Sequence, residues 1–208
     1  MGNETMWALV KEKPEEGLWM KRVPVPEVGY NDVKIKIRKT AICGTDVHIY
    51  EWNEWAQNTI SVGMTAGHEY VGEVVEVGAG VETLKVGDKV ALEPGITCGQ
   101  CEHCKEGHYN LCPDVVFLAT PPVQGCYEEY IAFPENMCFK LPENVSTKEG
   151  ALIEPLAVGF HAVFQGLACV EDTVLGGIEG AVGILSAQYW GKKDKSSIKK
   201  IIAVGLQF

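Results

Sequence analysis

Short runs that alternate apolar and polar residues fill the chain from residue 7 to about 145. Examples are DVKIKIRKT, YVGEVVEVG, DKVALEPG, YEEYIAFP and MCFKLPE, which Gly and Pro separate from one another. A period of two with frequent Val and Ile is typical of strands that bury one face. We therefore expect a mainly β fold here, built on a twisted and partly closed sheet. Gly72 and Gly78 lie inside one run and indicate a bulge or a sharp bend.

The periodicity becomes helical in the segment STKEGALIEPLAVGFHAVF, which begins at Ser146. Ser146 is a suitable N-cap, and Glu149 three residues later completes a capping box. The final residues, EDTVLGGIEGAVGILSAQYWGKKDKSSIKKIIAVGLQF, predict a strand, a Gly-rich turn, a short helix, a loop and a second strand. That order opens a βαβ unit. We place the boundary between two domains after residue 164, which gives domains 1–164 and 165–208.

Composition narrows the classes of partner. The 208 residues carry a formal net charge of -10, which argues against nucleic acid or an anionic membrane as a partner. No run of eighteen apolar residues predicts a transmembrane helix, and the N-terminus has no hydrophobic signal core. We therefore expect a cytoplasmic protein, a reducing setting in which clustered cysteines favour a metal over disulfides.

Four cysteines lie within fifteen residues, in the stretch CGQCEHCKEGHYNLC. Their spacing is C-x2-C-x2-C-x7-C, formed by Cys98, Cys101, Cys104 and Cys112. Four thiolates complete a tetrahedral shell with no open position, so we predict a structural zinc ion, with an iron–sulfur cluster or free thiols as alternatives. Since four sulfurs suffice, His103 and His108 are expected to face solvent.

A second group of candidate ligands is dispersed along the chain. Cys43 lies in ICGTDVHIY, His68 and Glu69 lie in GHEYVGEVVEVGAGV, and Glu154 lies in EPLAVG. One thiolate, one imidazole and carboxylates form a set that leaves a fourth position exchangeable, as catalytic zinc requires. The residues alone are explained equally well by purely structural roles. Cys43 would then be a core residue, His68 would be hydrogen-bonded within the fold, and the carboxylates would lie on the surface.

The stretch GHEYVGEVVEVGAGV resembles the zinc signature of the zinc-dependent medium-chain alcohol dehydrogenases. Gly67, Gly72 and Gly78 fall at that family's glycine positions, and ICGTDVH, the four-cysteine run and EPLAVG recur in the family's order over roughly residues 7–185. The resemblance implies a GroES-like catalytic domain with a structural zinc lobe. An incomplete α/β Rossmann remnant would follow it.

The motifs of the chain resemble two different branches of that superfamily. CGTDVHIYEWNEWAQ is similar to threonine dehydrogenases, whereas GHYNLCP, FLATPPVQG and ALIEPLAVG are similar to sorbitol-type polyol dehydrogenases. Threonine dehydrogenases usually carry a histidine where this chain has Gly95, which favours a polyol or diol substrate. The resemblance thus implies hydride transfer from a secondary alcohol to NAD or NADP, with L-threonine 3-dehydrogenase or a non-catalytic zinc-binding remnant as alternatives.

The resemblance also implies roles for individual residues. Cys43, His68 and Glu69 would bind a catalytic zinc ion, which Glu154 would approach directly or through a water molecule. That ion would lower the pKa of the substrate hydroxyl. Thr45 would pass the hydroxyl proton outward, with His48 as the next member of the relay. Tyr50 and Phe117 are candidates for the wall of the substrate cleft, and a homo-oligomer is expected.

The coenzyme half departs from the family's pattern. Gly177, Gly180 and Gly183 are the candidate coenzyme-binding glycines, but Ile178 stands where the first glycine of G-x-G-x-x-G belongs. Gly205 lies where an acidic residue should bind the ribose, which leaves NAD, NADP or no coenzyme open. Because two strands cannot cover both faces of a parallel sheet, we expect residues 165–208 to be stabilised by another chain, rearranged or partly disordered.

Overall fold

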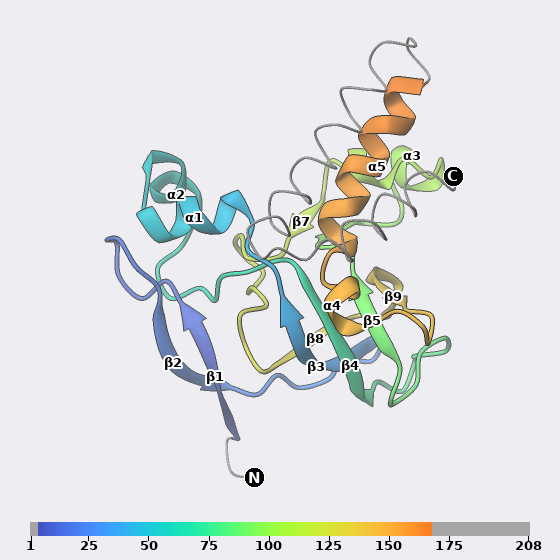
Figure 1. The fold of residues 1–208 in the computed structure, drawn as a ribbon, viewed down its shortest axis with the longest axis horizontal. Coiled ribbons are helices and arrows are strands. Elements are labelled where there is room, and N and C mark those ends of the chain that lie inside the picture. The colour runs from blue at the N-terminus through green and yellow to red at the C-terminus, as the bar shows by residue number, and fades with distance from the viewer. Residues whose placement is uncertain (1–3, 168–208) are drawn as a thin grey trace. The chain divides into compact units, whose positions relative to one another are not determined.

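A five-stranded antiparallel sheet forms the centre of the molecule (Figure 1), whose computed structural model describes residues 4–167. Its strand order is β8-β3-β4-β5-β9. The bounds are β3 Asp32–Thr40, β4 Tyr70–Val77, β5 Lys89–Leu92, β8 Tyr130–Pro134 and β9 Cys138–Lys140. Each strand lies within one of the alternating runs, so the mainly β fold predicted for this part of the chain is confirmed.

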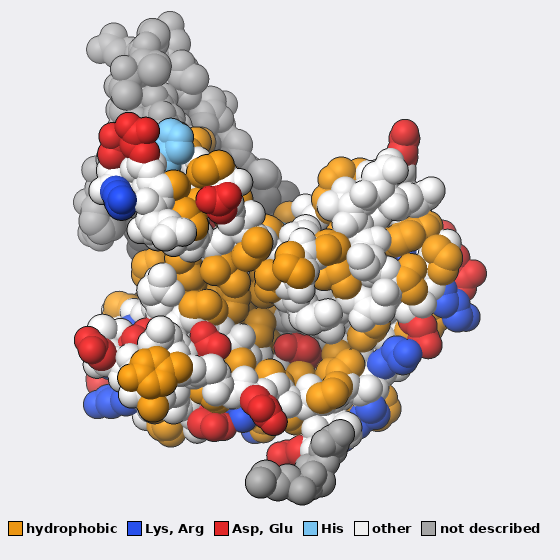
Figure 2. All heavy atoms as spheres, turned by 180° about the vertical axis from the view of Figure 1, so that it is seen from behind, with side chains coloured by type: hydrophobic (Ala, Val, Ile, Leu, Met, Phe, Trp, Pro, Cys, Tyr) orange, Lys and Arg blue, Asp and Glu red, His pale blue; other side chains and the backbone are white. Residues whose placement is uncertain are grey.

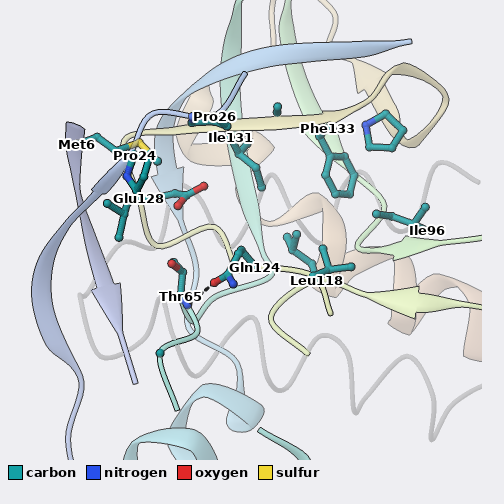
Figure 3. Close-up of a pocket in the computed structure, with 15 residues that line it drawn as sticks. Met6, Pro24, Pro26, Thr65, Ile96, Leu118, Gln124, Glu128, Ile131 and Phe133 are labelled. Carbon is teal, nitrogen blue, oxygen red and sulfur yellow. Dashed lines mark hydrogen bonds between the residues drawn. The ribbon is translucent and has the colours of Figure 1, made fainter. Parts of the chain in front are cut away.

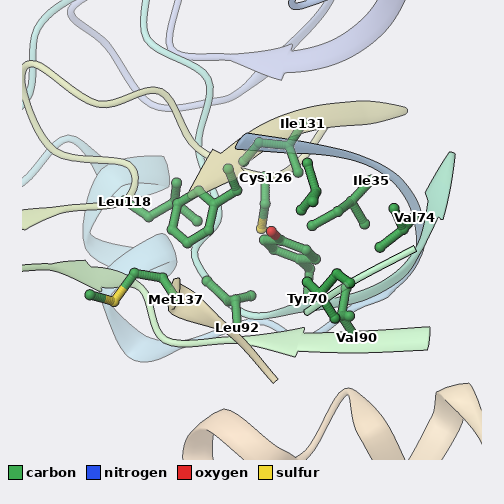
Figure 4. Close-up of a cluster of buried hydrophobic side chains, with 12 residues drawn as sticks. Ile35, Tyr70, Val74, Val90, Leu92, Leu118, Cys126, Ile131 and Met137 are labelled. Atoms are coloured by element: carbon green, nitrogen blue, oxygen red, sulfur yellow. The ribbon is translucent and has the colours of Figure 1, made fainter. Parts of the chain in front are cut away.

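The buried positions of these strands meet in one hydrophobic core (Figure 4). In β3, burial alternates along the first residues, with Val33 and Ile35 fully buried between partly exposed neighbours. The ring of Tyr70 packs edge-on against Phe133, with centroids 6.3 Å apart. Burial of apolar area, at roughly 25 cal/mol per Å², is the main force that holds the sheet in this register.

An irregularity lies beside Gly72, as the sequence predicted. Ile37 pairs with Gly72 and Lys39 with Val71, so the register shifts at Arg38 of β3. A side chain at Gly72 would meet the carbonyl oxygen of Lys36 at 2.7 Å. Only glycine therefore lets the two strands approach at the bulge.

β1 (Thr5–Val10) and β2 (Trp19–Pro24) form a separate two-stranded sheet. Backbone hydrogen bonds connect β1 to the segments before β4 and β8, because Ala66 N–H donates to the Leu9 carbonyl oxygen and Leu9 N–H donates to that of Tyr127. At the end of β1 the side chain of Lys11 is fully buried. Its ammonium group donates to the carbonyl oxygens of Glu15, Gly17 and Tyr50 and lies 4.8 Å from the ring centre of Trp52. Three carbonyl groups and an aromatic face replace the water that a buried ammonium group loses.

Two helices that the sequence analysis did not predict follow β3. They are α1 (Gly44–Glu51) and α2 (Glu54–Thr59). Asn53 caps α2, because its side-chain oxygen accepts a hydrogen bond from the backbone N–H of Ala56. These local hydrogen bonds, rather than hydrophobic periodicity, define the helices, so the pattern search missed them.

The four-cysteine run forms a separate lobe. It contains α3 (Glu102–Lys105) and the 3-10 turn η1 (Tyr109–Leu111), next to the short pair β6 (Gly95–Ile96) and β7 (Val116–Phe117). A second 3-10 turn, η2, spans Glu135–Met137.

The helical segment begins as predicted, with Ser146 and Glu149 in a capping box ahead of α4 (Thr147–Gly150). It then divides, because α5 (Ile153–Leu167) starts anew after two residues. The chain separates into two units, Met1–Glu154 and Pro155–Phe208. The predicted boundary at residue 164 stays a prediction, and the predicted βαβ opening lies outside the described residues.

Charges on the described surface are mixed. In Figure 2, Lys and Arg side chains lie apart from one another on the face shown and form no continuous basic patch there. Within residues 4–167, no helix combines the length and the apolar character needed to cross a membrane.

Candidate metal centres

The four lobe cysteines converge on one point. The sulfur atoms of Cys98, Cys101, Cys104 and Cys112 all lie within 4.8 Å of one another. Backbone N–H groups also point at the sulfurs: Cys101 N–H donates to Cys98 Sγ, and Cys104 N–H donates to Cys101 Sγ, each at 3.4 Å. The spacing of the run produces this geometry, since each two-residue step closes a tight turn around a thiol.

The turns prepare the lobe for a cation. Backbone N–H groups of Gln100 and Cys101 lower the pKa of the Cys98 thiol to about 7. Desolvation and the neighbouring thiols raise the pKa values of Cys101 and Cys112, so the four do not ionise together without a cation. Four thiols at this spacing match the donor set of a closed zinc site. His103 and His108 are both exposed, as expected if four sulfurs suffice.

A second cluster brings together the dispersed residues Cys43, His68 and Glu69, whose ligand atoms also lie within 4.8 Å of one another. Cys43 is the N-cap residue of α1, while His68 and Glu69 directly precede β4. The imidazole and the Glu69 carboxylate are about 95% buried, and 3.9 Å separate His68 Nε2 from Glu69 Oε1. The structure thus brings the three dispersed side chains together, while their role as zinc ligands stays a prediction.

Glu154, at the start of α5, also reaches this cluster. Its carboxyl group lies close enough to that of Glu69 for each to shift the pKa of the other. Burial, together with the negative charges of Glu69 and Glu93, raises the pKa of Glu154 to about 7. Two carboxyl groups in contact need a shared proton or a cation between them, and a cation-binding site meets that need.

Asp46 is a site residue that the sequence analysis missed. It is buried, and its Oδ2 accepts hydrogen bonds from Cys43 N–H at 2.9 Å and from the Tyr127 hydroxyl at 2.8 Å. Its Oδ1 lies 3.9 Å from His68 Nδ1 and has no hydrogen-bond partner among the residues that the structure describes. A carboxylate behind a metal-binding histidine orients the ring and increases its basicity. The signal that could have found it is its position three residues after the N-cap of α1.

Three features of this cluster fit a zinc ion. They are the unpaired oxygen of Asp46, the proximity of the Cys43, His68 and Glu69 donor atoms, and the neighbouring carboxyl groups of Glu69 and Glu154. Nitrogen, sulfur and oxygen donors with a carboxylate behind the histidine are the composition of a catalytic zinc site.

Gly67 and Tyr127 lock this cluster in place. Gly67 has a φ of +90°, and a Cβ atom there would lie 2.3 Å from the ring of Tyr127. The hydroxyl of the same tyrosine also lies 2.9 Å from the carbonyl oxygen of Ala41. The ring therefore connects the backbone before His68 with the backbone before Cys43, and only glycine leaves room for it.

The proposed proton relay is only partly visible. Thr45 Oγ1 lies 3.8 Å from Cys43 Sγ. The exposed His48 contacts α2 instead, because the Asn53 amide nitrogen lies 2.8 Å from His48 Nδ1. No hydrogen bond joins Thr45 to His48 within the described chain, so the relay remains a prediction.

Of the two candidates for the cleft wall, Phe117 borders the cluster, with its ring centre 5.6 Å from that of His68. The carbonyl oxygen of Tyr50 accepts a hydrogen bond from the buried Lys11 ammonium group. The candidate coenzyme glycines Gly177, Gly180 and Gly183 lie outside the described residues.

Replacing Asp46 by Asn should weaken zinc binding at the Cys43–His68–Glu69 cluster by about tenfold, because the negative charge behind His68 is lost. Competition with a chromogenic chelator would measure the affinity, and retention of the lobe metal would serve as an internal control. An unchanged affinity would show that Asp46 supports only the local fold.

Comparison with known proteins places this fold and these clusters in a family. Residues 29–143 match the family described as the alcohol dehydrogenase GroES-like domain. The chain therefore belongs to this family and, with its zinc signature, to the medium-chain alcohol dehydrogenase superfamily that its motifs indicated.

Among curated relatives, L-threonine 3-dehydrogenase of Escherichia coli K12 is 48% identical over 182 residues, which cover 88% of this chain and 53% of that protein. The chain thus spans about half the length of the curated relatives it matches. The alternative kept in the sequence analysis, threonine dehydrogenase, is better supported than the polyol assignment, which relied heavily on the single position Gly95.

Solved structures agree on the fold. Galactitol-1-phosphate dehydrogenase from Escherichia coli superposes with a TM-score of 0.73 at 28% identity, over 86% of this chain and 53% of that one. A zinc-binding dehydrogenase from Sinorhizobium meliloti 1021, bound to NADP, gives 0.69 at 31% identity, over 78% and 46%. The GroES-like fold expected from the motifs is confirmed for the described residues.

Proposed function

We propose that this chain carries the catalytic domain of a zinc-dependent dehydrogenase that oxidises the secondary hydroxyl group of L-threonine. The observation that carries the proposal is the buried Cys43–His68–Glu69 cluster, in a chain 48% identical to an L-threonine 3-dehydrogenase. Glu154 and Asp46 complete its surroundings. The nicotinamide coenzyme is NAD or NADP, and a small-molecule alcohol is the substrate.

Cys43, His68 and Glu69 would hold the catalytic zinc ion, while the four lobe cysteines would hold a structural one. Zinc at the first site supplies Lewis acidity, which lowers the pKa of a hydroxyl group next to it. Asp46 orients the His68 ring from behind, and Phe117 shields that ring on one side. Thr45, in the first turn of α1, would relay the proton of the substrate hydroxyl by accepting it while passing its own hydroxyl proton to solvent. A nicotinamide coenzyme, when bound, would accept the hydride from the carbon that carries this hydroxyl group.

Coenzyme reduction by the zinc-loaded chain would test this proposal with L-threonine, sorbitol, xylitol and butanediol as substrates. We expect threonine to give the highest kcat/KM, and we expect the His68→Ala variant to fall to background because it loses a buried ligand of the cluster. Turnover of sorbitol or xylitol without threonine would instead support the polyol assignment. A chain that binds both zinc ions but oxidises none of the four would support a non-catalytic zinc-binding module.

A further inference from the structure

A cavity that belongs to neither metal cluster lies between the β1–β2 sheet and the central sheet (Figure 3). Its volume is about 440 Å³, within the range of roughly 300–1,000 Å³ of small-molecule sites. Most of its wall is apolar and comes from several separate segments of the chain, with Met6, Pro24, Ile131 and Phe133 among the lining residues. Such a wall suits the hydrocarbon part of a ligand.

Three polar side chains interrupt this wall. Figure 3 shows the Glu128 carboxyl group directed into the cavity, with Thr65 and Gln124 on the same side. Gln124 Oε1 accepts a hydrogen bond from the backbone N–H of Thr65 at 2.8 Å, which fixes both residues. Thr65 is 97% buried, and it lines the cavity together with Glu128.

Glu128 is the one charged residue among the described residues that line the cavity. No described residue forms an ion pair or a side-chain hydrogen bond with it, and burial raises the pKa of its carboxyl group to about 8. Folded proteins normally pair such a group, because leaving it unpaired costs stability. An unpaired carboxyl group that is retained in an apolar cavity marks a candidate ligand site.

We propose that this cavity binds a primary amine with a short apolar chain. The ammonium group would bind the Glu128 carboxylate and the Thr65 hydroxyl, and the chain would lie against Met6, Ile131 and Phe133. A cation is favoured over an anion because Glu128 is the charged group of the wall. The site is independent of the zinc clusters and of the proposed dehydrogenase activity.

Calorimetric titration of the zinc-loaded chain with butylammonium chloride at pH 7 tests the site, with 1-butanol as an uncharged probe of the same shape. Since burial raises the pKa of Glu128 to about 8, binding of the cation at pH 7 is expected to release protons from its carboxyl group. That release appears as a dependence of the measured heat on the ionisation enthalpy of the buffer. We expect butylammonium to bind more tightly than butanol.

The Glu128→Gln variant should bind butylammonium about tenfold to a hundredfold more weakly, because a charge-assisted hydrogen bond is lost. Glu143→Gln removes the same charge from an exposed position away from the cavity and should bind like the parent. Equal affinity in parent and Glu128→Gln, binding without proton release, or no binding would each overturn the proposal. Because the readout is ligand binding, its failure leaves the dehydrogenase proposal unaffected.

Discussion

A Cys104→Ser variant is expected to bind one zinc ion per chain, where the parent is expected to bind one in each of its two cysteine-containing clusters. Serine cannot supply the thiolate that completes the closed sulfur shell, so the lobe metal is lost while the Cys43–His68–Glu69 site is retained. Binding of structural zinc is coupled to folding of the lobe, and we expect the free energy of unfolding to fall by about 3–5 kcal/mol.

The central sheet should survive that change, because the hydrophobic core contains none of the four lobe cysteines. Metal analysis and urea unfolding would measure both effects. Cys138→Ser is the matched control, since Cys138 lies outside both clusters and its thiol donates only to the Pro134 carbonyl oxygen. A Cys104→Ser protein that keeps two zinc ions would contradict a four-sulfur site.

Replacing Glu128 by Gln is expected to stabilise the protein, and more so as the pH rises. The carboxyl pKa is about 8 in the folded protein but about 4.5 in the unfolded chain. Between these values the folded state binds more protons than the unfolded state, so the free energy of unfolding falls as pH rises through this window. The neutral amide of Gln does not titrate, which removes this loss.

At pH 8 the Glu128→Gln variant should exceed the parent in free energy of unfolding by about 2–3 kcal/mol, whereas at pH 5 the difference should be below about 1 kcal/mol. Urea unfolding at the two pH values would measure it, with Glu143→Gln as a control that shows no such trend. If the difference between variant and parent is the same at both pH values, Glu128 does not titrate in an apolar setting.

The sequence predicted the strands well because their burial follows a simple alternation. The runs around β3 and β4 match the observed strands within one residue, and the register shift at Arg38 lies beside the glycine that indicated it. The capping box at Ser146 was equally visible, because it depends on two residues three positions apart.

The two metal clusters also differed in how well the sequence predicted them. The lobe cysteines are close in the chain, so their spacing alone indicated a shared ion. Cys43 and His68 are separated by 25 positions, and only the resemblance to a family brought them together before the structure did. Asp46 was missed because α1 was not predicted, so the carboxylate three residues after its N-cap was not considered as a neighbour of His68.

The contact between Gly67 and Tyr127 also limits how this chain can evolve. Any side chain at position 67 collides with the aromatic ring, and loss of the ring at position 127 removes a hydrogen bond to Asp46. A single substitution that enlarges residue 67 therefore weakens the fold before a second change can accommodate it. Reducing the ring first would not free position 67 either, because its φ of +90° strains any side chain there, so each of the two positions limits change on its own.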